Sequence, residues 1–413
     1  MFRQAFVRYI DNFRGFRREV WILAAITFIN RAGTMVLPFL SKYLREDLHF
    51  SHDDVGTVLV FFGLGSLIGS WLGGKLSDKI GFYKVMVFSL FTSGLLFFTI
   101  QFVTSFYGMC AAMFGIMVVA DMFRPAMFVS IGTYAKPENR TRAFTLVRLA
   151  VNLGFGLGPA IGGLLIVSLG YKALFYVDGI TCITAITLFW LLVKEKKKAP
   201  DAAKDIVTET VHRNVYRDGA FWIFLFCSLA SATVFFQLFS TLPIYHREHY
   251  GLTELETGLL MSLNGLLIFA LEMPIVGYLE RKNVEKLRIV LWGALLMGAS
   301  MLSLLYNQWA GILIVSMLII TFAEMFNFPF SNAFAMGRAP RGQEGKYMAL
   351  YTMTFSAAHM VSAKAGLGIV SHWGNKWGGD WGYQMNWIFM GGLGLLSCLA
   401  LVYLRRRIAT ETV

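Results

Sequence analysis

Charged residues are scarce in this sequence. Asp, Glu, Lys and Arg make up 15% of the 413 residues, whereas hydrophobic residues make up 56% and the mean hydropathy is +0.58. A soluble globular protein averages about 25% charged residues. A chain this long and this apolar has too few polar side chains to cover its surface in water, so the composition excludes a soluble protein. It indicates a protein that crosses a membrane many times.

Cysteine is scarce as well, and it forms no chemical motif. None of the four cysteines has the Cys-x-x-Cys spacing of a metal site or redox centre. They lie singly in apolar runs, at Cys110, Cys182, Cys227 and Cys398. The sequence also lacks a Gly-x-x-x-x-Gly-Lys-Ser/Thr loop, a paired-histidine metal motif and a nucleophile elbow. We therefore expect no disulfide framework, no metal, no ATP drive within this chain and no enzymatic activity.

Acidic residues are fewer than basic ones, 25 Asp and Glu against 37 Lys and Arg. The basic residues gather in short loops between apolar runs, so we expect no nucleic-acid partner. Membrane proteins keep Lys and Arg in their cytoplasmic loops. If the N-terminus lies inside, the inner loops hold Lys79, Lys84, Lys136, Arg140, Arg142, Arg281, Lys282, Arg338 and Arg405. This distribution predicts that both termini lie in the cytoplasm. The first apolar run is long and no small-residue cleavage site clearly follows it, so we expect it to be an uncleaved span.

Twelve apolar stretches are each long enough to cross the hydrocarbon core as a helix, which takes about 20 residues. Six lie in residues 20–193 and six in residues 219–404, separated by a lysine-rich linker at 194–218. The sequence thus predicts an all-α membrane protein with 12 transmembrane helices in two six-helix bundles. Residues 1–19 are expected to form a basic amphipathic helix that binds membrane lipids, and residues 405–413 a cytoplasmic tail.

The two halves of the chain resemble each other. Ala120–Pro125 in the fourth apolar stretch aligns with Ala323–Phe328 in the tenth, and Gly74 aligns with Gly277 at the same offset. Internal repeats of this kind are typical of transporters, whose substrate site lies near the membrane midplane between the repeats. The repeat predicts two pseudo-symmetric bundles with a binding site between them.

A short polar hairpin separates the second and third apolar stretches. It reads Gly-x-x-x-Asp-Lys-x-Gly-x-x-Lys, with Gly74, Asp78, Lys79, Gly81 and Lys84 at the specified positions. This spacing resembles the signature loop of the major facilitator superfamily. The resemblance implies the fold of that superfamily. It also implies that these five residues form a conformational latch on the inner side, which breaks and re-forms as the two halves rock.

A second motif lies in the fifth apolar stretch. Glycines four residues apart form a smooth helix face that lets a neighbouring helix approach closely. The pattern Gly-x-x-x-Gly-Pro-x-x-Gly-Gly also resembles the fifth-helix motif of the antiporter branches of the superfamily, and that resemblance favours export. The positions of this helix-packing motif are Gly154, Gly158, Pro159, Gly162 and Gly163.

Ionisable residues inside membrane spans cost about 2.5 kcal/mol or more at the centre, and they usually face a cavity. Glu324 lies in the middle of the tenth stretch, with no cation three or four residues away. We expect it to bind and release a proton unless another helix supplies a partner. A structural ion pair with Lys364 or Arg31 is the alternative. The further proton-coupling candidates are Asp121, Glu272 and His359.

Other polar residues inside the apolar stretches are candidates for lining a substrate cavity. Asp121 and Arg124 are three residues apart, so a continuous helix would place them on one face and let them pair. The superfamily resemblance also implies an arginine in the fourth helix, for which Arg124 is the candidate. The remaining cavity candidates are Asn30, Arg31, Arg148, Gln237, Asn264, Asn327 and Lys364. The many phenylalanines and the 20 methionines suit a lipophilic, loosely specified substrate.

Together these features predict a secondary active transporter of the inner membrane that works by alternating access, has no cofactor and is driven by the proton gradient. We expect a monomer that exports lipophilic or drug-like small molecules in exchange for protons. One alternative is a proton symporter that takes up a peptide, a sugar or an organic acid. Only Arg31 matches the Glu-x-x-Glu-Arg pattern of the first helix of peptide symporters. The other alternative is a non-transporting membrane receptor or enzyme, which the lack of a sensory domain or catalytic motif disfavours.

Overall fold

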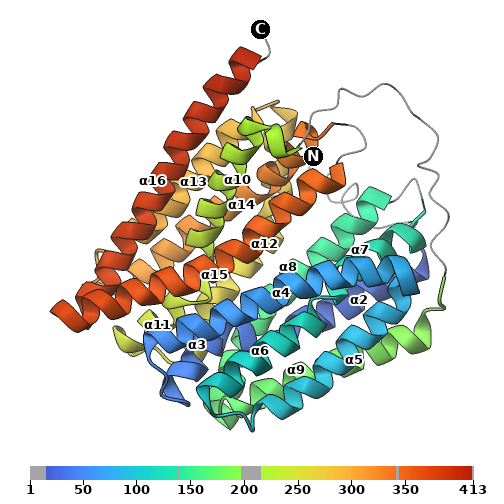
Figure 1. The fold of residues 1–413 in the computed structure, drawn as a ribbon, viewed down its shortest axis with the longest axis horizontal. Coiled ribbons are helices and arrows are strands. Elements are labelled where there is room, and N and C mark those ends of the chain that lie inside the picture. Colours follow the sequence, from blue (N-terminus) through green and yellow to red (C-terminus); the bar gives the residue numbers. More distant parts are fainter. Residues whose placement is uncertain (1–14, 137–139, 197–214, 341–343, 412–413) are drawn as a thin grey trace, which may run out of the picture.

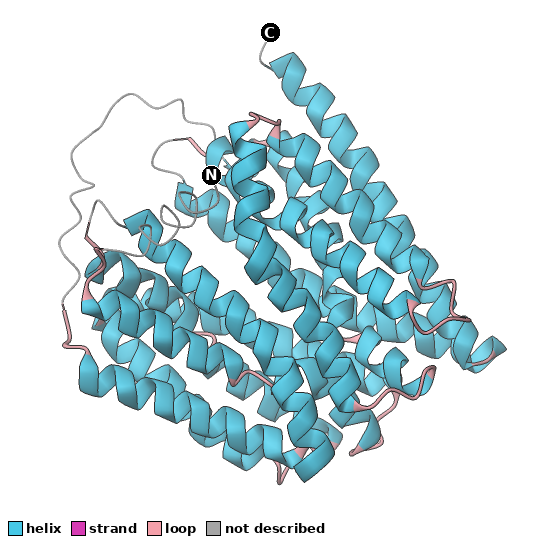
Figure 2. Cartoon of the chain, turned by 180° about the vertical axis from the view of Figure 1, so that it is seen from behind, coloured by secondary structure: helices cyan, strands magenta, loops and turns pink. Residues whose placement is uncertain are grey.

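The computed structural model describes residues 15–136, 140–196, 215–340 and 344–411. Every regular element in these ranges is a helix, as Figure 2 shows, so the predicted all-α fold is confirmed. Most of the predicted amphipathic segment and most of the predicted linker lie outside the described residues.

The first half of the chain forms one six-span bundle, called the first bundle below. Its helices are α2 (Arg18–Ala32), α3 (Val36–Glu46), α4 (His52–Ile80), α5 (Phe82–Ile100), α6 (Phe106–Ala120), α7 (Phe123–Tyr134), α8 (Arg140–Leu169) and α9 (Lys172–Leu192). Two of the spans are broken helices, because α2 with α3 and α6 with α7 each make one membrane-length stretch.

The second half forms the second bundle. Its elements are η2 (Val215–Arg217), α10 (Gly219–Phe235), η3 (Phe236–Leu238), α11 (Thr241–Glu248), α12 (Glu254–Arg281), α13 (Lys286–Ser303), α14 (Ile312–Arg338), α15 (Glu344–Trp377) and α16 (Gly379–Glu411). In the described part of the chain, eleven helical stretches are long and apolar enough to cross a membrane. The more polar α15, with 34 residues, is the twelfth predicted crossing.

The broken fourth span follows from its sequence. Pro125 lies in the first turn of α7, where a helix needs no backbone N–H from that residue. In a continuous helix its ring would clash with the carbonyl of Asp121, four residues earlier. The chain therefore ends α6 at Ala120, uses Asp121 as the C-cap and starts α7 at Phe123.

The two bundles lie side by side, and Figure 1 shows α8 with α12 and α4 with α15 along their boundary. One hydrophobic core crosses this boundary, joining Phe39 and Leu44 of the first bundle to Leu242 and Trp387 of the second. We call this the closed end, which holds the loop at 47–51. At the opposite end, called the open end, each bundle has a core of its own.

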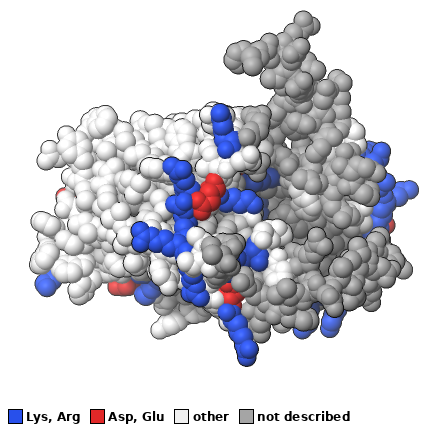
Figure 3. Space-filling model, turned by 90° about the horizontal axis from the view of Figure 1, so that it is seen from above, with Lys and Arg blue, Asp and Glu red and all other residues white. Residues whose placement is uncertain are grey.

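The open end carries the basic loops. The chain turns there at Gly81, whose φ of +91° favours glycine, and again between α12 and α13. Figure 3 shows this end of the molecule, with Lys and Arg gathered over its middle and few Asp or Glu among them. Exposed basic residues in these turns include Lys79, Lys84, Lys282 and Lys286. The distribution is the one that predicts a cytoplasmic location for the open end.

Candidate transport cavity

A cavity of about 420 Å³ lies between the two bundles. Small-molecule sites typically enclose roughly 300–1,000 Å³ and are lined mainly by apolar and aromatic groups with a few polar ones. Its walls come from α2 to α9 on one side and from α10, η3, α12, α14 and α15 on the other. Of the residues predicted from sequence, those in the lining are Asn30, Arg31, Asp121, Arg124, Asn264, Glu324 and His359.

Glu324 projects into this cavity from α14 with 7% of its surface exposed. Its Oε1 accepts a hydrogen bond of 2.7 Å from Nδ2 of Asn264 on α12. The same amide group donates to Oγ1 of Thr321, one turn before Glu324, at 3.0 Å. No Lys or Arg among the described residues forms an ion pair with Glu324, so neither Lys364 nor Arg31 is its partner.

His359 lies between aromatic rings from both bundles. Its ring centre is 5.2 Å from that of Phe62 on α4 and 4.8 Å from that of Phe236 in η3. The side chain is buried, and within the described part of the chain its Nδ1 has no hydrogen-bond partner. An imidazole in this position joins the apolar wall of the cavity and keeps one nitrogen available for a ligand.

Asp121 and Arg124 both line the cavity, but the predicted pair between them is absent from the described contacts. Asp121 accepts a hydrogen bond from Oγ of Ser66 on α4, whereas Arg124 is exposed toward the cavity. The prediction assumed a continuous helix. Because the span breaks at Asp121, the three-residue spacing no longer puts the two side chains on one face.

Arg31 lies in the last turn of α2, where its guanidinium carbon is 5.6 Å from the ring centre of Phe155. The glycine motif of α8 packs directly behind it. A Cβ at Gly154 would come within 2.6 Å of Cβ of Arg31, and one at Gly158 within 3.1 Å of the carbonyl of Ala32. The small residues therefore hold the end of α2, and with it Arg31, against α8.

The same motif also contacts the second bundle. A Cβ at Gly163 would lie 2.4 Å from the carbonyl oxygen of Glu254 on α12. Gly258 of α12 faces the carbonyl oxygen of Pro159 in the same way, at 2.2 Å for a hypothetical Cβ. Gly162 meets Met35 of the first bundle. The α8 glycines thus serve two contacts, one within the first bundle and one across the boundary.

Asp178 is a cavity residue that the sequence analysis missed. It lies on α9 with 2% of its surface exposed, and its two carboxylate oxygens accept from the backbone N–H groups of Met35 at 3.0 Å and Val36 at 3.1 Å. These are N–H groups at the start of α3, where a helix lacks internal acceptors. A single acidic residue in an otherwise apolar stretch was the available signal. Asp178 caps the break in the first span.

Replacing Asp178 by alanine is expected to destabilise the protein. The two N–H groups would lose their acceptors in a buried site, which costs about 2 kcal/mol or more. Thermal unfolding of the detergent-solubilised protein measures the effect as a lower midpoint. Asp47→Ala, which removes an exposed carboxylate at the end of α3, is the matched control. Equal midpoints for the two variants would contradict the capping role.

Ion pairs join the bundles at the closed end. Lys42 on α3 is fully buried, and its Nζ lies 3.1 Å from Oε1 of Glu254 on α12. Nearby, Nε of Arg45 lies 2.9 Å from Oε1 of Glu248 on α11. Each pair links the first bundle to the second. Separating the bundles at this end requires both pairs to break.

Hydrogen bonds of Tyr171 and Ala160 reinforce this contact. The hydroxyl of Tyr171 donates to Glu46 at 2.8 Å and to Glu254 at 3.3 Å. Burial and these two carboxylates raise the pKa of Tyr171, so the phenol remains a donor. The backbone N–H of Ala160 on α8 donates to Oγ of Ser262 on α12 at 2.9 Å.

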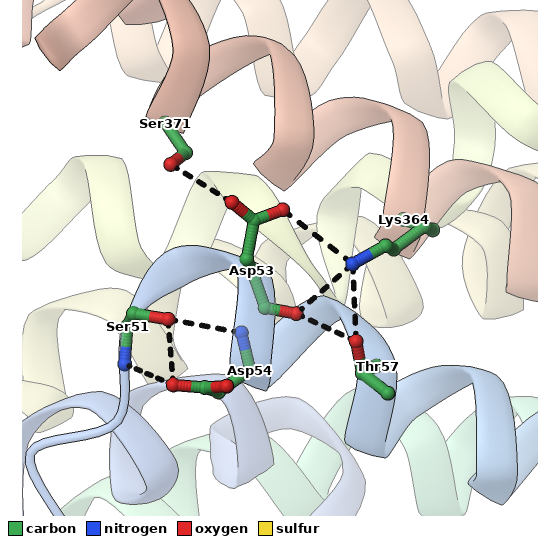
Figure 4. Close-up of polar contacts among 6 residues, drawn as sticks. All are labelled: Ser51, Asp53, Asp54, Thr57, Lys364 and Ser371. Carbon is green, nitrogen blue, oxygen red and sulfur yellow. Dashed lines mark hydrogen bonds and ion pairs between the residues drawn. The ribbon is translucent and has the colours of Figure 1, made fainter.

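Lys364 belongs to the boundary between α15 and α4 and lies outside the cavity lining, contrary to the prediction. Its Nζ contacts Oδ1 of Asp53 at 3.4 Å and Oγ1 of Thr57 at 3.0 Å, and Ser371 donates to the same carboxylate (Figure 4). Asp53 is at the start of α4, next to the capping box that Ser51 and Asp54 form. The lysine thus joins the bundles near the closed end.

Arg148 and Glu272, predicted for the cavity and for proton coupling, pair with each other across the boundary and lie outside the lining. Asn152 on α8 also donates to Glu272, at 3.2 Å. Glu272 therefore has a cationic partner and a hydrogen-bond donor, both from the first bundle. This contact lies toward the open end, since Arg148 is near the start of α8 and Glu272 near the end of α12.

Gln237 and Asn327 were predicted to line the cavity, but both are buried inside the second bundle and neither belongs to the cavity lining. Nε2 of Gln237 donates to Ser362 on α15, and Nδ2 of Asn327 lies 3.3 Å from Oγ of Ser231 on α10.

For the predicted latch, the structure places Gly74 in open space and Lys79 and Lys84 at the surface. The side chain of Asp78 lies outside the described residues, so the latch stays a prediction.

The architecture and cavity are those of a membrane transporter built from two six-helix repeats around a central small-molecule site. The sequence model of the Major Facilitator Superfamily matches residues 20–363, and the chain belongs to this superfamily. The family predicted from the hairpin at Gly74–Lys84 is thus confirmed.

Relatives match the chain at low identity. Over 409 residues the chain is 24% identical to a Na(+), Li(+), K(+)/H(+) antiporter of Planococcus maritimus, which covers 90% of this chain and 91% of that protein. Over 191 residues the chain is 27% identical to quinolone resistance protein NorA of Staphylococcus aureus (strain N315). This match covers 44% of this chain and 47% of that protein. A solved structure of a POT family transporter in complex with 5-aminolevulinic acid superposes with a TM-score of 0.80 at 16% identity. The match covers 96% of this chain and 98% of that chain, so the two proteins share the fold.

Proposed function

We propose that this transporter exports lipophilic or drug-like small molecules across the inner membrane in exchange for protons. The observation that carries the proposal is Glu324, a buried carboxylate in the cavity wall whose described polar partner is the amide of Asn264. A carboxylate in such a place is neutralised by a proton or by a cationic group, because an uncompensated charge in an apolar site costs several kcal/mol, on the order of 2.5 or more.

Competition at Glu324 would couple the two fluxes. A proton on the carboxyl group and a cationic group of the substrate occupy the same site, so only one of them binds at a time. If the carrier switches between its inward-facing and outward-facing states only when Glu324 is protonated or bound to substrate, it exchanges protons for substrate. Asp121, which is hydrogen-bonded to Ser66, is the second carboxyl group with which a proton would be shared.

The apolar wall supports an organic substrate. Phe62, Phe155, Phe236, Phe328 and Phe355 line the cavity, and rings of this kind bind varied lipophilic groups with little directional demand. One named relative, a Na(+), Li(+), K(+)/H(+) antiporter, supports the exchange mode, and the other, a quinolone resistance protein, supports a drug-like substrate.

The arrangement of the bundles supports an inward-facing state. The bundles share a core and several ion pairs at the closed end, whereas toward the open end each has a separate core and the described ion pair between them is that of Arg148 with Glu272. The open end carries the basic turns that predict a cytoplasmic location. In this state a substrate would enter the cavity from the cytoplasm, which is the first step of export.

Everted membrane vesicles test the proposed function directly. With an imposed gradient, acidic inside, vesicles that contain the protein are expected to accumulate fluorescent lipophilic compounds such as ethidium and norfloxacin. Nigericin, which collapses the pH gradient, should release them, and vesicles without the protein provide the background. Accumulation of dipeptides or sugars in right-side-out vesicles, with no movement of any lipophilic compound, would instead establish uptake by symport and reject the proposal.

A further inference from the structure

We propose that the cavity selects amphoteric substrates, binding a carboxylate with Arg31 and Arg124 of the first bundle and an amine with Glu324 of the second. The inference rests on the proposed function and names its substrate class. The two arginines line the cavity from α2 and α7, and Glu324 lines it from α14. Groups of opposite charge therefore border the same space from opposite bundles.

The two arginines carry the positive charge of the first bundle's wall, and Arg31 interacts electrostatically with both Arg124 and Asp121. Among the described residues, neither Arg31 nor Arg124 forms an ion pair; Arg31 packs on the ring of Phe155. Of the two carboxylates on the same wall, Asp178 accepts from two backbone N–H groups, and Asp121 accepts from Ser66 while its charge acts on Arg31. A guanidinium stays charged at any physiological pH and binds carboxylates in a bidentate manner. An anionic group on the ligand would give the two guanidinium groups a bidentate partner.

Purely charged ligands fit this cavity less well. A lipophilic cation would meet Glu324 but would also bring a like charge into a space bordered by two arginines, and a lipophilic anion would face the reverse conflict. A molecule with a carboxylate at one end, an amine at the other and an aromatic body between them satisfies all three groups. Its body would lie among Phe155, Phe236 and His359.

This ligand would also distinguish the substrate-loaded state from the protonated state. The substrate would connect the two bundles through its two charged ends, whereas a proton on Glu324 leaves Arg31 and Arg124 without an anion. The two forms of the carrier thus differ in a contact across the boundary. That difference is what a ligand needs in order to shift a conformational equilibrium.

Three forms of one probe test the charge requirement. Norfloxacin carries a carboxylate and an amine, its ethyl ester keeps only the amine, and its N-acetyl derivative keeps only the carboxylate. In proteoliposomes driven by a pH gradient, we expect norfloxacin to be transported with a kcat/KM at least tenfold higher than either derivative. Equal transport of the ester would overturn the amphoteric site and leave proton-coupled export standing. If the protein transported neither ethidium nor any of these three compounds, the proposed function itself would be rejected.

Variants then assign the site. Arg31→Gln and Arg124→Gln are each expected to lower the ratio of norfloxacin to ester transport at least tenfold, a ratio that is independent of the amount of folded protein. Arg406→Gln, at an exposed position near the end of α16, is the matched control and should keep the wild-type ratio. An unchanged ratio in both cavity variants would overturn the assignment.

Discussion

Replacing Glu324 by glutamine is expected to abolish transport driven by a pH gradient, lowering it at least 100-fold. The amide has nearly the same size and can still accept the hydrogen bond from Asn264, so the packing around α14 should persist. It cannot take up a proton or neutralise a cationic group. The measurement is norfloxacin and ethidium accumulation in everted vesicles, normalised to the amount of inserted protein.

Asp47→Asn is the control for this variant, since it neutralises an exposed carboxylate far from the cavity lining. The control should transport at the wild-type rate. Gradient-driven accumulation at that rate by the Glu324→Gln protein would remove Glu324 from the proton pathway. Asp121→Asn would then be the next variant to measure, because Asp121 is the other predicted proton-coupling carboxylate in the lining.

The fold could be predicted from the sequence because a membrane span leaves few choices. A chain in lipid must satisfy its backbone groups internally, so each long apolar stretch becomes a helix. The breaks within spans were harder to predict. Pro125 was a visible signal, but the break between Ala32 and Val36 depends on Asp178, which comes from a helix far along the chain.

The cost of burying a charge was the main guide to the site in the sequence. It identifies ionisable residues inside the spans but not their partners. That cost singled out Glu324, Arg31, Arg124, Asn264 and His359, and the structure places all five in the cavity lining. On the same ground, Arg148, Glu272 and Lys364 were also predicted to line the cavity or to couple protons. The structure shows that these three find partners across the boundary between the bundles, Lys364 with a residue 311 positions away. Spacing along one helix carries no information on such pairs.

Inserting a large side chain at Gly258 is expected to hold the bundles apart at the closed end. In α12, a Cβ at Gly258 would lie 2.2 Å from the carbonyl oxygen of Pro159, and one at Gly265 2.5 Å from Cα of Gly156. These contacts are backbone against backbone, and a backbone cannot move aside as a flexible side chain can. Gly258→Leu should therefore lower transport at least tenfold, because the inward-facing state can no longer close at that end.

Gly277→Leu is the control on the same helix, because a Cβ at Gly277 has no neighbour within 4 Å. Spin labels on cysteines placed at Tyr107, near the start of α6, and at Tyr306, three residues after the end of α13, report the separation of the bundles, because both positions are exposed at the closed end. The four native cysteines are buried and free. We expect a longer distance in Gly258→Leu than in Gly277→Leu. Wild-type transport and distance in Gly258→Leu would show that the α8–α12 contact does not set the closed state.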